Sequence, residues 1–331
     1  MNNKKALIVG INNYPNSANK LNCCVNDANE IAKLLERNYD ESKNFDVAEL
    51  LDADATECNI KGCLNKVFDD DTDVGLFYFS GHGNSDNKVG RLVTYDYSAV
   101  NGGLDFNELN KILVHSKCKN KIVILDCCFS GLAGNETSFL IDTSILSRGT
   151  TILAACRERE LASEIGDHGV FTNLLVLALS GGSSDLFGRV TPASVYSYID
   201  SCLSAFEQRP LFKSYVSSFI TLRQCKPKMT TTEIRNLCSL FASSTAKVQL
   251  DPSFEPTNYE GSREIAPKDL KKPYHKDENV KLFALLQKGN RNGLIVPTNE
   301  KHMYYAAMNS DSCELTKLGV HYWLLASKKI I

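Results

Sequence analysis

Short segments that are apolar at nearly every position constrain the fold of this chain more than any other feature. Residues 5–11, 74–79 and 122–125 read KALIVGI, VGLFYF and IVIL, and each is too short for a typical buried helix. Strands of this kind have both faces covered, which is typical of a parallel sheet between layers of helices. The sequence therefore predicts an α/β fold built on a mostly parallel sheet.

Segments with helical periodicity separate these strands. Residues 28–35 carry apolar side chains at a helical spacing, and Asn26 or Asp27 is a candidate N-cap for that helix. Alternating strands and helices favour a three-layer sandwich. Further strands are expected at residues 45–51 and 150–155, further helices at residues 56–68, 106–114, 171–179 and 191–206, and a strand that closes the sheet at residues 215–222.

A change of composition near residue 228 marks a second part of the chain. Up to residue 228 there are 23 Lys and Arg and 28 Asp and Glu, so acidic residues are in excess. From Met229 onward there are 14 Lys and Arg and 11 Asp and Glu, so basic residues are in excess. Residues 251–273 hold four of the nine prolines and few apolar side chains, which is typical of a linker. We therefore expect one domain over residues 1–228, a helix and linker over 229–275, and a small α+β, winged-helix-like accessory domain over 276–331.

Charge and hydropathy exclude several classes of protein. The formal charge is −2, which disfavours a general polyanion binder. No apolar run approaches the roughly 20 residues of a membrane span, and the one after Lys5 is shorter than the ~7–15 residues of a signal-peptide core. The twelve cysteines include no C-x2-C pair, which disfavours a structural zinc site. We expect reduced thiols in a cytoplasmic protein.

Two glycine-containing polar segments directly follow buried strands. Ser80-Gly81-His82-Gly83 comes after residues 74–79, and DCCFSG, residues 126–131, comes after residues 122–125. Loops after parallel strands meet at one edge of the sheet, where active sites form. A histidine and a cysteine placed there can act as a base and a nucleophile, since the thiolate attacks and the imidazolium protonates the leaving amine. The N–H groups of Gly83 and Cys128 are candidates for an oxyanion hole.

Six segments together resemble one family. They occur in its order and spacing over roughly residues 4–225, and the chain is similar to the caspase-like cysteine peptidases, in particular their metacaspase, orthocaspase and paracaspase branches. The resemblance implies a caspase-like three-layer fold and a cysteine endopeptidase. The segments are ALIVGINNY, LNCCVNDA, FYFSGHG, VILDCCFSG, TTILAACRERELASE and GVFTNLLVLAL.

The resemblance also implies roles for individual residues. His82 would be the base and Cys128 the nucleophile, because Cys128 and not Cys127 fills the D-x-C-x-S-G position. The pocket for the substrate residue before the cleaved bond, S1, would be lined by Asp27, Ser80 and Asp126. Two carboxylates there favour Arg or Lys at P1 through charge-assisted hydrogen bonds and would repel Asp.

Several of these residues also have simpler interpretations. Asp27 can be only a helix N-cap, Asp126 can cap the turn after its strand, and Cys127 is expected to be a buried core residue. Arg148 is the only basic residue between Gly131 and Arg157, which makes it a candidate for self-cleavage or else an ordinary surface arginine.

A cofactor is not required by this chemistry, and no metal ligand set is predicted. Many metacaspases have His after the nucleophile, where this chain has Phe129. Asp69, Asp70, Asp71 and Asp73 lie in a region where some relatives bind Ca²⁺. However, calcium needs a shell of 6–8 oxygens, which an acidic run alone does not establish. Calcium dependence therefore stays open.

The resemblance implies a regulated protease acting on proteins after Arg or Lys, since relatives of this branch are associated with cell death or antiviral defence. An activating partner, a small ligand or self-association are candidate regulators, and no membrane role is expected. The alternative is a caspase-like scaffold or signal-binding module with little turnover. Paired aromatics in residues 276–331 favour a small core or a docking surface, and the scattered lysines make only a weak case for nucleic-acid binding.

Overall fold

The computed structural model describes residues 3–16, 19–86, 89–98, 101–130, 146–155, 164–165, 168–203, 210–216 and 218–331. The chain divides into two compact units, Met1–Lys226 and Pro227–Ile331, and each unit is described by itself. Within the ranges described, every helix is too short or too polar to cross a membrane.

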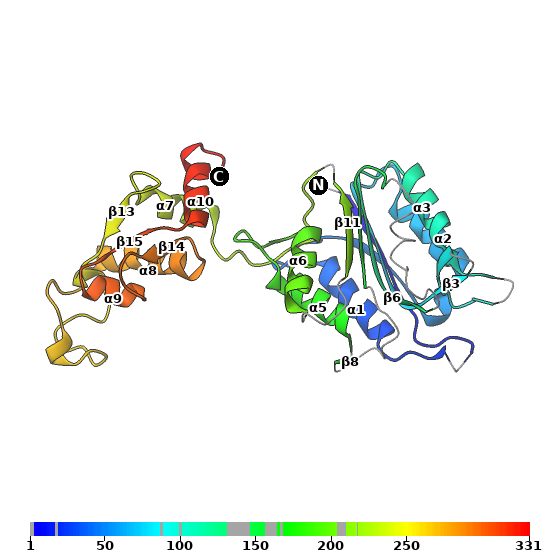
Figure 1. The fold of residues 1–331 in the computed structure, drawn as a ribbon, viewed down its shortest axis with the longest axis horizontal. Coiled ribbons are helices and arrows are strands. Elements are labelled where there is room, and N and C mark those ends of the chain that lie inside the picture. The colour runs from blue at the N-terminus through cyan, green and yellow to red at the C-terminus, as the bar shows by residue number, and fades with distance from the viewer. Residues whose placement is uncertain are drawn as a thin grey trace. The chain divides into compact units, whose positions relative to one another are not determined.

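A largely parallel sheet forms the centre of the first unit (Figure 1). Its strand order is β11-β7-β6-β3-β1-β2, in which only β11, at one edge, runs antiparallel to its neighbour in that row. The α/β sandwich on a mostly parallel sheet, which the apolar strands predicted, is confirmed. The strands are β1 (Lys4–Gly10), β2 (Asp46–Leu51), β3 (Val74–Asp86), β4 (Val89–Leu92), β5 (Leu104–Asp105), β6 (Asn120–Ser130), β7 (Thr150–Ala154) and β11 (Leu211–Tyr215).

Helices bury both faces of this sheet (Figure 1). In β1, β3 and β6, even-numbered positions such as Tyr78 and Ile124 join the core under α1, α5 and α6, whereas odd-numbered positions such as Phe77 join the core under α2 and α3. Both faces are apolar because strand side chains alternate and each layer of helices supplies an apolar stripe. The helices are α1 (Cys24–Glu36), α2 (Glu57–Val67), α3 (Phe106–His115), α5 (Val170–Leu177) and α6 (Pro192–Cys202).

Small two-stranded sheets complete the first unit. Each pairs short strands that lie outside the main sheet. They join β10 (Arg189–Val190) to β12 (Arg223–Gln224), and β8 (Glu164–Ile165) to β9 (His168–Gly169).

Three local predictions were wrong. Helix α1 begins at Cys24 with Cys23 as its N-cap residue, so Asp27 lies inside the first turn and does not cap it. The strand that closes the sheet is β11, which overlaps the segment 215–222 predicted for it only at Tyr215, and it pairs with β7 along its whole length.

The third correction concerns β3 and β6, which both continue beyond the ends that their apolar runs predicted. The two strands pair with each other as far as Asn84 and Ser130, and β3 also pairs antiparallel with β4. The segments expected as strand-end loops are therefore continuations of strands, because each supplies the other with hydrogen-bond partners.

Gly10 lies where β1 passes closest to α1. A β-carbon at this position would lie 2.7 Å from Cβ of Ala28 and would also overlap the carbonyl oxygen of Cys24. We expect Gly10→Ala to lower the free energy of unfolding by about 1–3 kcal/mol, the usual cost of overpacking. Gly62 is the control, since a β-carbon there meets nothing within 4 Å, and Gly62→Ala in α2 should stabilise by roughly 0.5–1 kcal/mol. Urea unfolding measures both, and equal midpoints would contradict the close approach.

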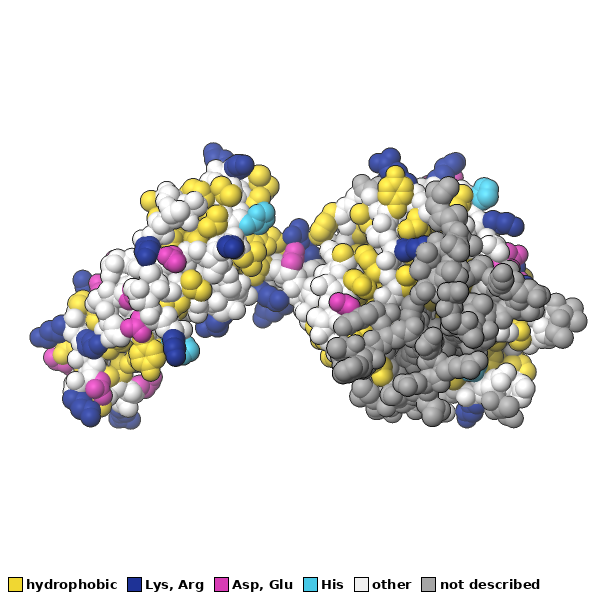
Figure 2. Space-filling model, viewed as in Figure 1, with side chains coloured by type: hydrophobic (Ala, Val, Ile, Leu, Met, Phe, Trp, Pro, Cys, Tyr) yellow, Lys and Arg dark blue, Asp and Glu magenta, His cyan; other side chains and the backbone are white. Residues whose placement is uncertain are grey.

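The second unit combines a three-stranded antiparallel sheet with helices, an α+β arrangement as expected. Trp323 Nε1 donates to the carbonyl oxygen of Phe241 at 2.9 Å, and Phe283 and Leu286 are buried. Lys and Arg side chains are spread over the face of this unit that Figure 2 shows. Its elements are α7 (Thr231–Ser239), β13 (Lys247–Gln249), α8 (Asp277–Arg291), β14 (Ile295–Pro297), α9 (Met303–Met308), β15 (Ser312–Leu315) and α10 (Lys317–Ser327), with strand order β13-β15-β14.

The proline-rich segment 251–273 belongs to the second unit. It folds around Asn258, which is fully buried and whose side-chain amide donates to the carbonyl oxygens of Pro252 and Lys271. The amide N–H of Lys271 donates back to Asn258 Oδ1 at 3.0 Å. One buried amide thus holds a segment whose composition alone is typical of a linker.

Candidate active site

The pairing of β3 with β6 brings the two motifs of the sequence together. His82 is the register partner of Cys128, and Ser80 is the register partner of Asp126. Register partners on adjacent strands lie about 5 Å apart along the hydrogen-bonding direction. The side chains of residues 128–130 lie outside the described part of the structure, so the thiol of Cys128 is located here only by its backbone position.

His82 is held from two sides by backbone and side-chain groups of the segment that follows β1. Its Nε2 lies 2.8 Å from the carbonyl oxygen of Asn19, and its backbone N–H donates to the hydroxyl of Tyr14 at 2.9 Å. Its own carbonyl oxygen accepts from the N–H of Val93. The imidazole is partly exposed, so a substrate can reach it.

The three residues assigned to the S1 pocket form one buried polar cluster. Asp27, Ser80 and Asp126 are 1%, 2% and 8% exposed. Ser80 Oγ donates to Asp27 Oδ2 over a long 3.4 Å, and α1 and β3 carry these two residues from distant parts of the chain. The carboxylate of Asp126 accepts from the Thr172 hydroxyl at 2.7 Å. The structure therefore brings together the residues that the resemblance assigned to one pocket.

The charges of Asp27 and Asp126 raise the pKa values of neighbouring groups. Burial raises the pKa of the Cys24 thiol to about 12, a hydrogen bond from Ser80 opposes this rise, and the charges of Asp126 and Asp27 add to it. Burial, followed by the same two charges, holds the pKa of Tyr78 well above its usual value. Both effects place the carboxyls of Asp27 and Asp126 close to Cys24 and Tyr78 in a buried, acidic environment.

Two residues of this cluster, Tyr78 and Thr172, were not assigned to it from the sequence. Tyr78 donates to the Thr172 hydroxyl at 2.6 Å, and Thr172 in turn donates to Asp126. Thr172 lies on α5, far along the chain from either strand, and its pattern predicts only a helical core position. Tyr78 could have been found, because it precedes Ser80 by one pleat of β3 and must share its face.

Cys127 belongs to the opposite side of the sheet. It is 3% exposed and lies in the core cluster with Phe77, Phe79 and Leu125. This core also contains residues of α2 and α3, and it does not include Ser80 or Asp126. The prediction that Cys127 is a buried neighbour of the nucleophile is consistent with this position.

The remaining candidate residues lie at the other end of the sheet. Arg148 is exposed in the turn before β7, next to Gly149, whose carbonyl oxygen accepts from the N–H of Lys121 at the start of β6. Lys121 and Cys128 are separated by seven strand residues, or roughly 23 Å. Arg148 is therefore remote from His82.

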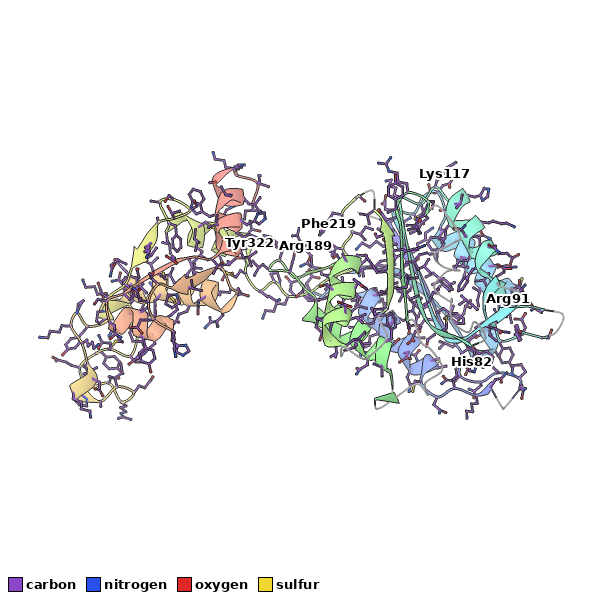
Figure 3. All side chains as sticks on the ribbon, viewed as in Figure 1. His82, Arg91, Lys117, Arg189, Phe219 and Tyr322 are labelled. Atoms are coloured by element: carbon purple, nitrogen blue, oxygen red, sulfur yellow. The ribbon has the colours of Figure 1, made fainter. Side chains whose placement is uncertain are left out.

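The acidic run is engaged in surface ion pairs at the same far end. Asp70 pairs with Lys117 at 2.9 Å and Asp73 with Lys119 at 2.6 Å, and Figure 3 shows Lys117 and His82 at opposite ends of the first unit. Within the part of the chain that the structure describes, no group of three or more His, Cys, Asp or Glu could hold a metal ion.

Comparison with known proteins identifies the family. A family model described as the caspase domain of C14 peptidases matches residues 3–244, which is most of the chain. The chain belongs to the caspase-domain family. Members of this family are cysteine peptidases, so the caspase domain supports a cysteine protease that acts on protein substrates.

Two solved structures are similar to this chain at low sequence identity, and the first of them shows the same fold. Protein GSU0716 from Geobacter sulfurreducens is 19% identical, with a TM-score of 0.51, over 68% of this chain and 98% of that one. Caspase-1 from Spodoptera frugiperda is 14% identical, with a TM-score of 0.46, over 69% of this chain and 92% of that one. No protein of curated function matches the sequence.

Proposed function

We propose that this caspase-domain protein is a cysteine endopeptidase that cleaves proteins after Arg, and less readily after Lys, through a Cys128–His82 dyad. The single observation that supports this is the register of β3 and β6. It pairs His82 with Cys128 and, one pleat earlier, Ser80 with the buried carboxyl of Asp126. A nucleophile, a base and a cation-binding pocket would thus adjoin one another.

The surroundings of His82 favour one arrangement of its protons. The carbonyl oxygen of Asn19 can only accept, so the contact at 2.8 Å requires a proton on Nε2 of His82. In the neutral ring Nδ1 is then the basic nitrogen. Nδ1 would take the thiol proton of Cys128, and the resulting thiolate would attack the scissile carbonyl. The imidazolium would next donate that proton to the leaving amine, and an activated water would hydrolyse the acyl-enzyme.

The oxyanion that forms in this reaction needs N–H donors. Gly83 and Cys128 remain the proposed donors, and both belong to the paired ends of β3 and β6. A donor of this type typically contributes on the order of 10²–10³-fold to the rate. This role requires their N–H groups to be turned toward the substrate when it binds.

The preference for Arg rests on charge and burial. Asp27 and Asp126 are both buried. One carboxylate oxygen of Asp126 already accepts a hydrogen bond from the Thr172 hydroxyl. A guanidinium has five N–H donors in a planar fork and can bond two carboxylates at once, whereas an ammonium is a point donor that is harder to desolvate. An Asp side chain at P1 would add a third negative charge to the same pocket.

A panel of fluorogenic peptides that differ only at P1 tests the proposal. The full chain is assayed with Arg, Lys, citrulline and Asp at P1, with and without Ca²⁺. We expect Arg to exceed Lys, and both to exceed the neutral citrulline and Asp by at least about 10²-fold in kcat/KM. A preference for Asp would contradict the acidic pocket. Absence of turnover in every arm would favour the scaffold or signal-binding alternative.

No cofactor is proposed for catalysis, and Ca²⁺ remains an optional activator that the same panel tests. Self-cleavage after Arg148 would have to occur between molecules, because Arg148 and His82 lie at opposite ends of the sheet. Its rate would then rise with the square of protein concentration, which a dilution series measures. A rate independent of dilution would contradict this.

The wider role that we propose is that of a regulated effector protease in the cytoplasm, acting in cell death or antiviral defence. The domain boundaries proposed from the sequence are residues 1–228 for the peptidase, 229–275 for a helix and linker, and 276–331 for a winged-helix-like accessory domain. In the structure, β13 and the segment 251–273 pack with residues 276–331 in one unit. An activating partner, a small ligand or self-association would control it. Activity of the purified full chain with and without host-cell extract tests for such control.

A further inference from the structure

Tyr14 fills a gap in the hydrogen bonding of the sheet at the candidate base. The parallel neighbour β1 ends with Gly10 opposite Ser80, and the N–H of Ile11 donates to Ser80. The antiparallel neighbour β4 ends with Leu92 opposite Gly83. The backbone N–H of His82 therefore lies between the two neighbouring strands and has a backbone partner in neither.

The hydroxyl of Tyr14 occupies this gap. It accepts from the N–H of His82 at 2.9 Å and is 3.3 Å from the carbonyl oxygen of Val93, to which it donates. The rings of Tyr14 and His82 lie 5.1 Å apart between centroids, at 41° to each other. A β-carbon on Gly81 would lie 2.8 Å from the hydroxyl, so glycine at this position leaves the room that the contact needs.

The hydroxyl stays protonated in this environment. Tyr14 is 7% exposed, and burial raises its pKa above the usual value, although the hydrogen bond from His82 opposes the rise. A neutral phenol can accept one hydrogen bond and donate another at the same time, which a phenolate cannot. The bridge from His82 to Val93 is thus complete at neutral pH.

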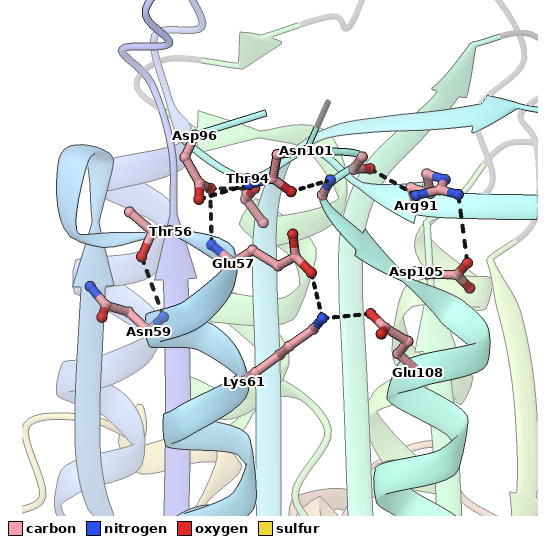
Figure 4. Close-up of polar contacts among 12 residues, drawn as sticks. Thr56, Glu57, Asn59, Lys61, Arg91, Thr94, Asp96, Asn101, Asp105 and Glu108 are labelled. Atoms are coloured by element: carbon pink, nitrogen blue, oxygen red, sulfur yellow. Dashed lines mark hydrogen bonds and ion pairs between the residues drawn. The ribbon is translucent and has the colours of Figure 1, made fainter. Parts of the chain in front are cut away.

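Both ends of the bridge are anchored. On the side of Val93, the hydroxyl of Thr94 donates to the carboxylate of Asp96 (Figure 4). The same carboxylate also accepts from the N–H of Glu57 and from the side-chain amide of Asn101. On the side of Tyr14, Asp52 accepts from the N–H groups of residues 12 and 13. The hydroxyl therefore connects His82 to two fixed segments.

We propose that Tyr14 is a positioning residue for His82, whose hydroxyl holds the backbone of the base so that its Nε2 stays on the carbonyl of Asn19. The expected effect of Tyr14 on turnover rests on the proposed function, whereas its hydrogen bond to the backbone of His82 does not. Without the hydroxyl, the N–H of His82 would be unpaired and the backbone would shift to find another partner. A shift of about 1 Å in a catalytic group can cost roughly 10²-fold in rate.

Tyr14→Phe removes the hydroxyl and keeps the ring. We expect kcat for the Arg peptide to fall by about 10–10²-fold while KM changes less than about threefold, with a displaced acidic limb in the pH profile of kcat. Tyr97→Phe is the control. It also loses one hydroxyl contact, the 2.8 Å bond from Asn84 Nδ2, but does not touch His82, and it should retain wild-type kinetics.

NMR of the His82 ring and amide provides a readout that does not depend on turnover. In the Cys128→Ala background, Tyr14→Phe should speed hydrogen exchange of the His82 amide by at least about tenfold and mix the ring tautomers, while Tyr97→Phe should change neither. Unchanged exchange and an unchanged tautomer would overturn the proposal. So would global unfolding of Tyr14→Phe, since the hydroxyl would then stabilise the unit as a whole. A wild-type protein without turnover would contradict the proposed function only, because the NMR result stands separately.

Discussion

Replacement of Cys128 by Ala is expected to reduce kcat/KM for the Arg peptide by on the order of 10⁴-fold or more, because the acyl-enzyme can no longer form. His82→Gln should have a similar effect, since the thiol then lacks its base. The double variant should lose little beyond either single variant, because the two residues act in one step. Initial rates under subsaturating substrate measure all three.

Cys127→Ala is the matched control for this prediction. It removes the adjacent thiol, which lies on the other side of the sheet in the core with Phe77 and Phe79. It should cost about 1 kcal/mol of stability through the small cavity and leave kcat within about threefold of wild type. If Cys127→Ala abolished turnover and Cys128→Ala kept it, the nucleophile would be assigned to the wrong cysteine.

Neutralising the buried carboxylates is expected to abolish the preference for Arg. Asp126→Asn and Asp27→Asn keep the shape of each side chain but leave a P1 guanidinium without one charged partner. Losing one member of a buried charge pair costs about 2–5 kcal/mol, or roughly 30- to 5,000-fold in kcat/KM for Arg. Cleavage after citrulline should change far less, so the Arg-to-citrulline ratio measures the pocket itself.

Asp46→Asn is the control for the change in net charge. Asp46 is exposed on β2 and pairs at the surface with Lys43 at 3.0 Å, remote in structure from the buried cluster. It should leave the Arg-to-citrulline ratio unchanged. An equal ratio in wild type, Asp27→Asn and Asp126→Asn would show that the two carboxylates do not form the S1 pocket.

Much of the fold was predictable because its signals are local. The apolar runs of β1, β3 and β6 and the helical periodicity of α1 and α2 identify those elements without reference to the rest of the chain. The edge strand β11 was misplaced because its burial depends on one neighbour, β7, and leaves a weak pattern. The ends of β3 and β6 were also misjudged, since polar residues continue a strand when a partner strand pairs with them.

The residues of the candidate site also differ in how clearly the sequence points to them. His82, Cys128 and Asp126 stand in glycine-containing motifs after apolar runs, and the sequence singles them out. Tyr14 and Thr172 do not stand out, because a tyrosine in a loop and a threonine in an apolar helix have many ordinary uses. Their roles follow from hydrogen bonds between segments that are far apart along the chain.

The sequence by itself determined the α/β class and the family, and it singled out His82 and Cys128 as the proposed base and nucleophile, because alternation, periodicity and short motifs depend only on neighbouring residues. Tertiary structure decided which residues meet. The register of β3 and β6 sets His82 beside Cys128, and the packing of α1 on β1 and β3 brings Asp27 to Ser80. Such contacts depend on long-range packing between surfaces, and that packing is a property of the folded chain as a whole.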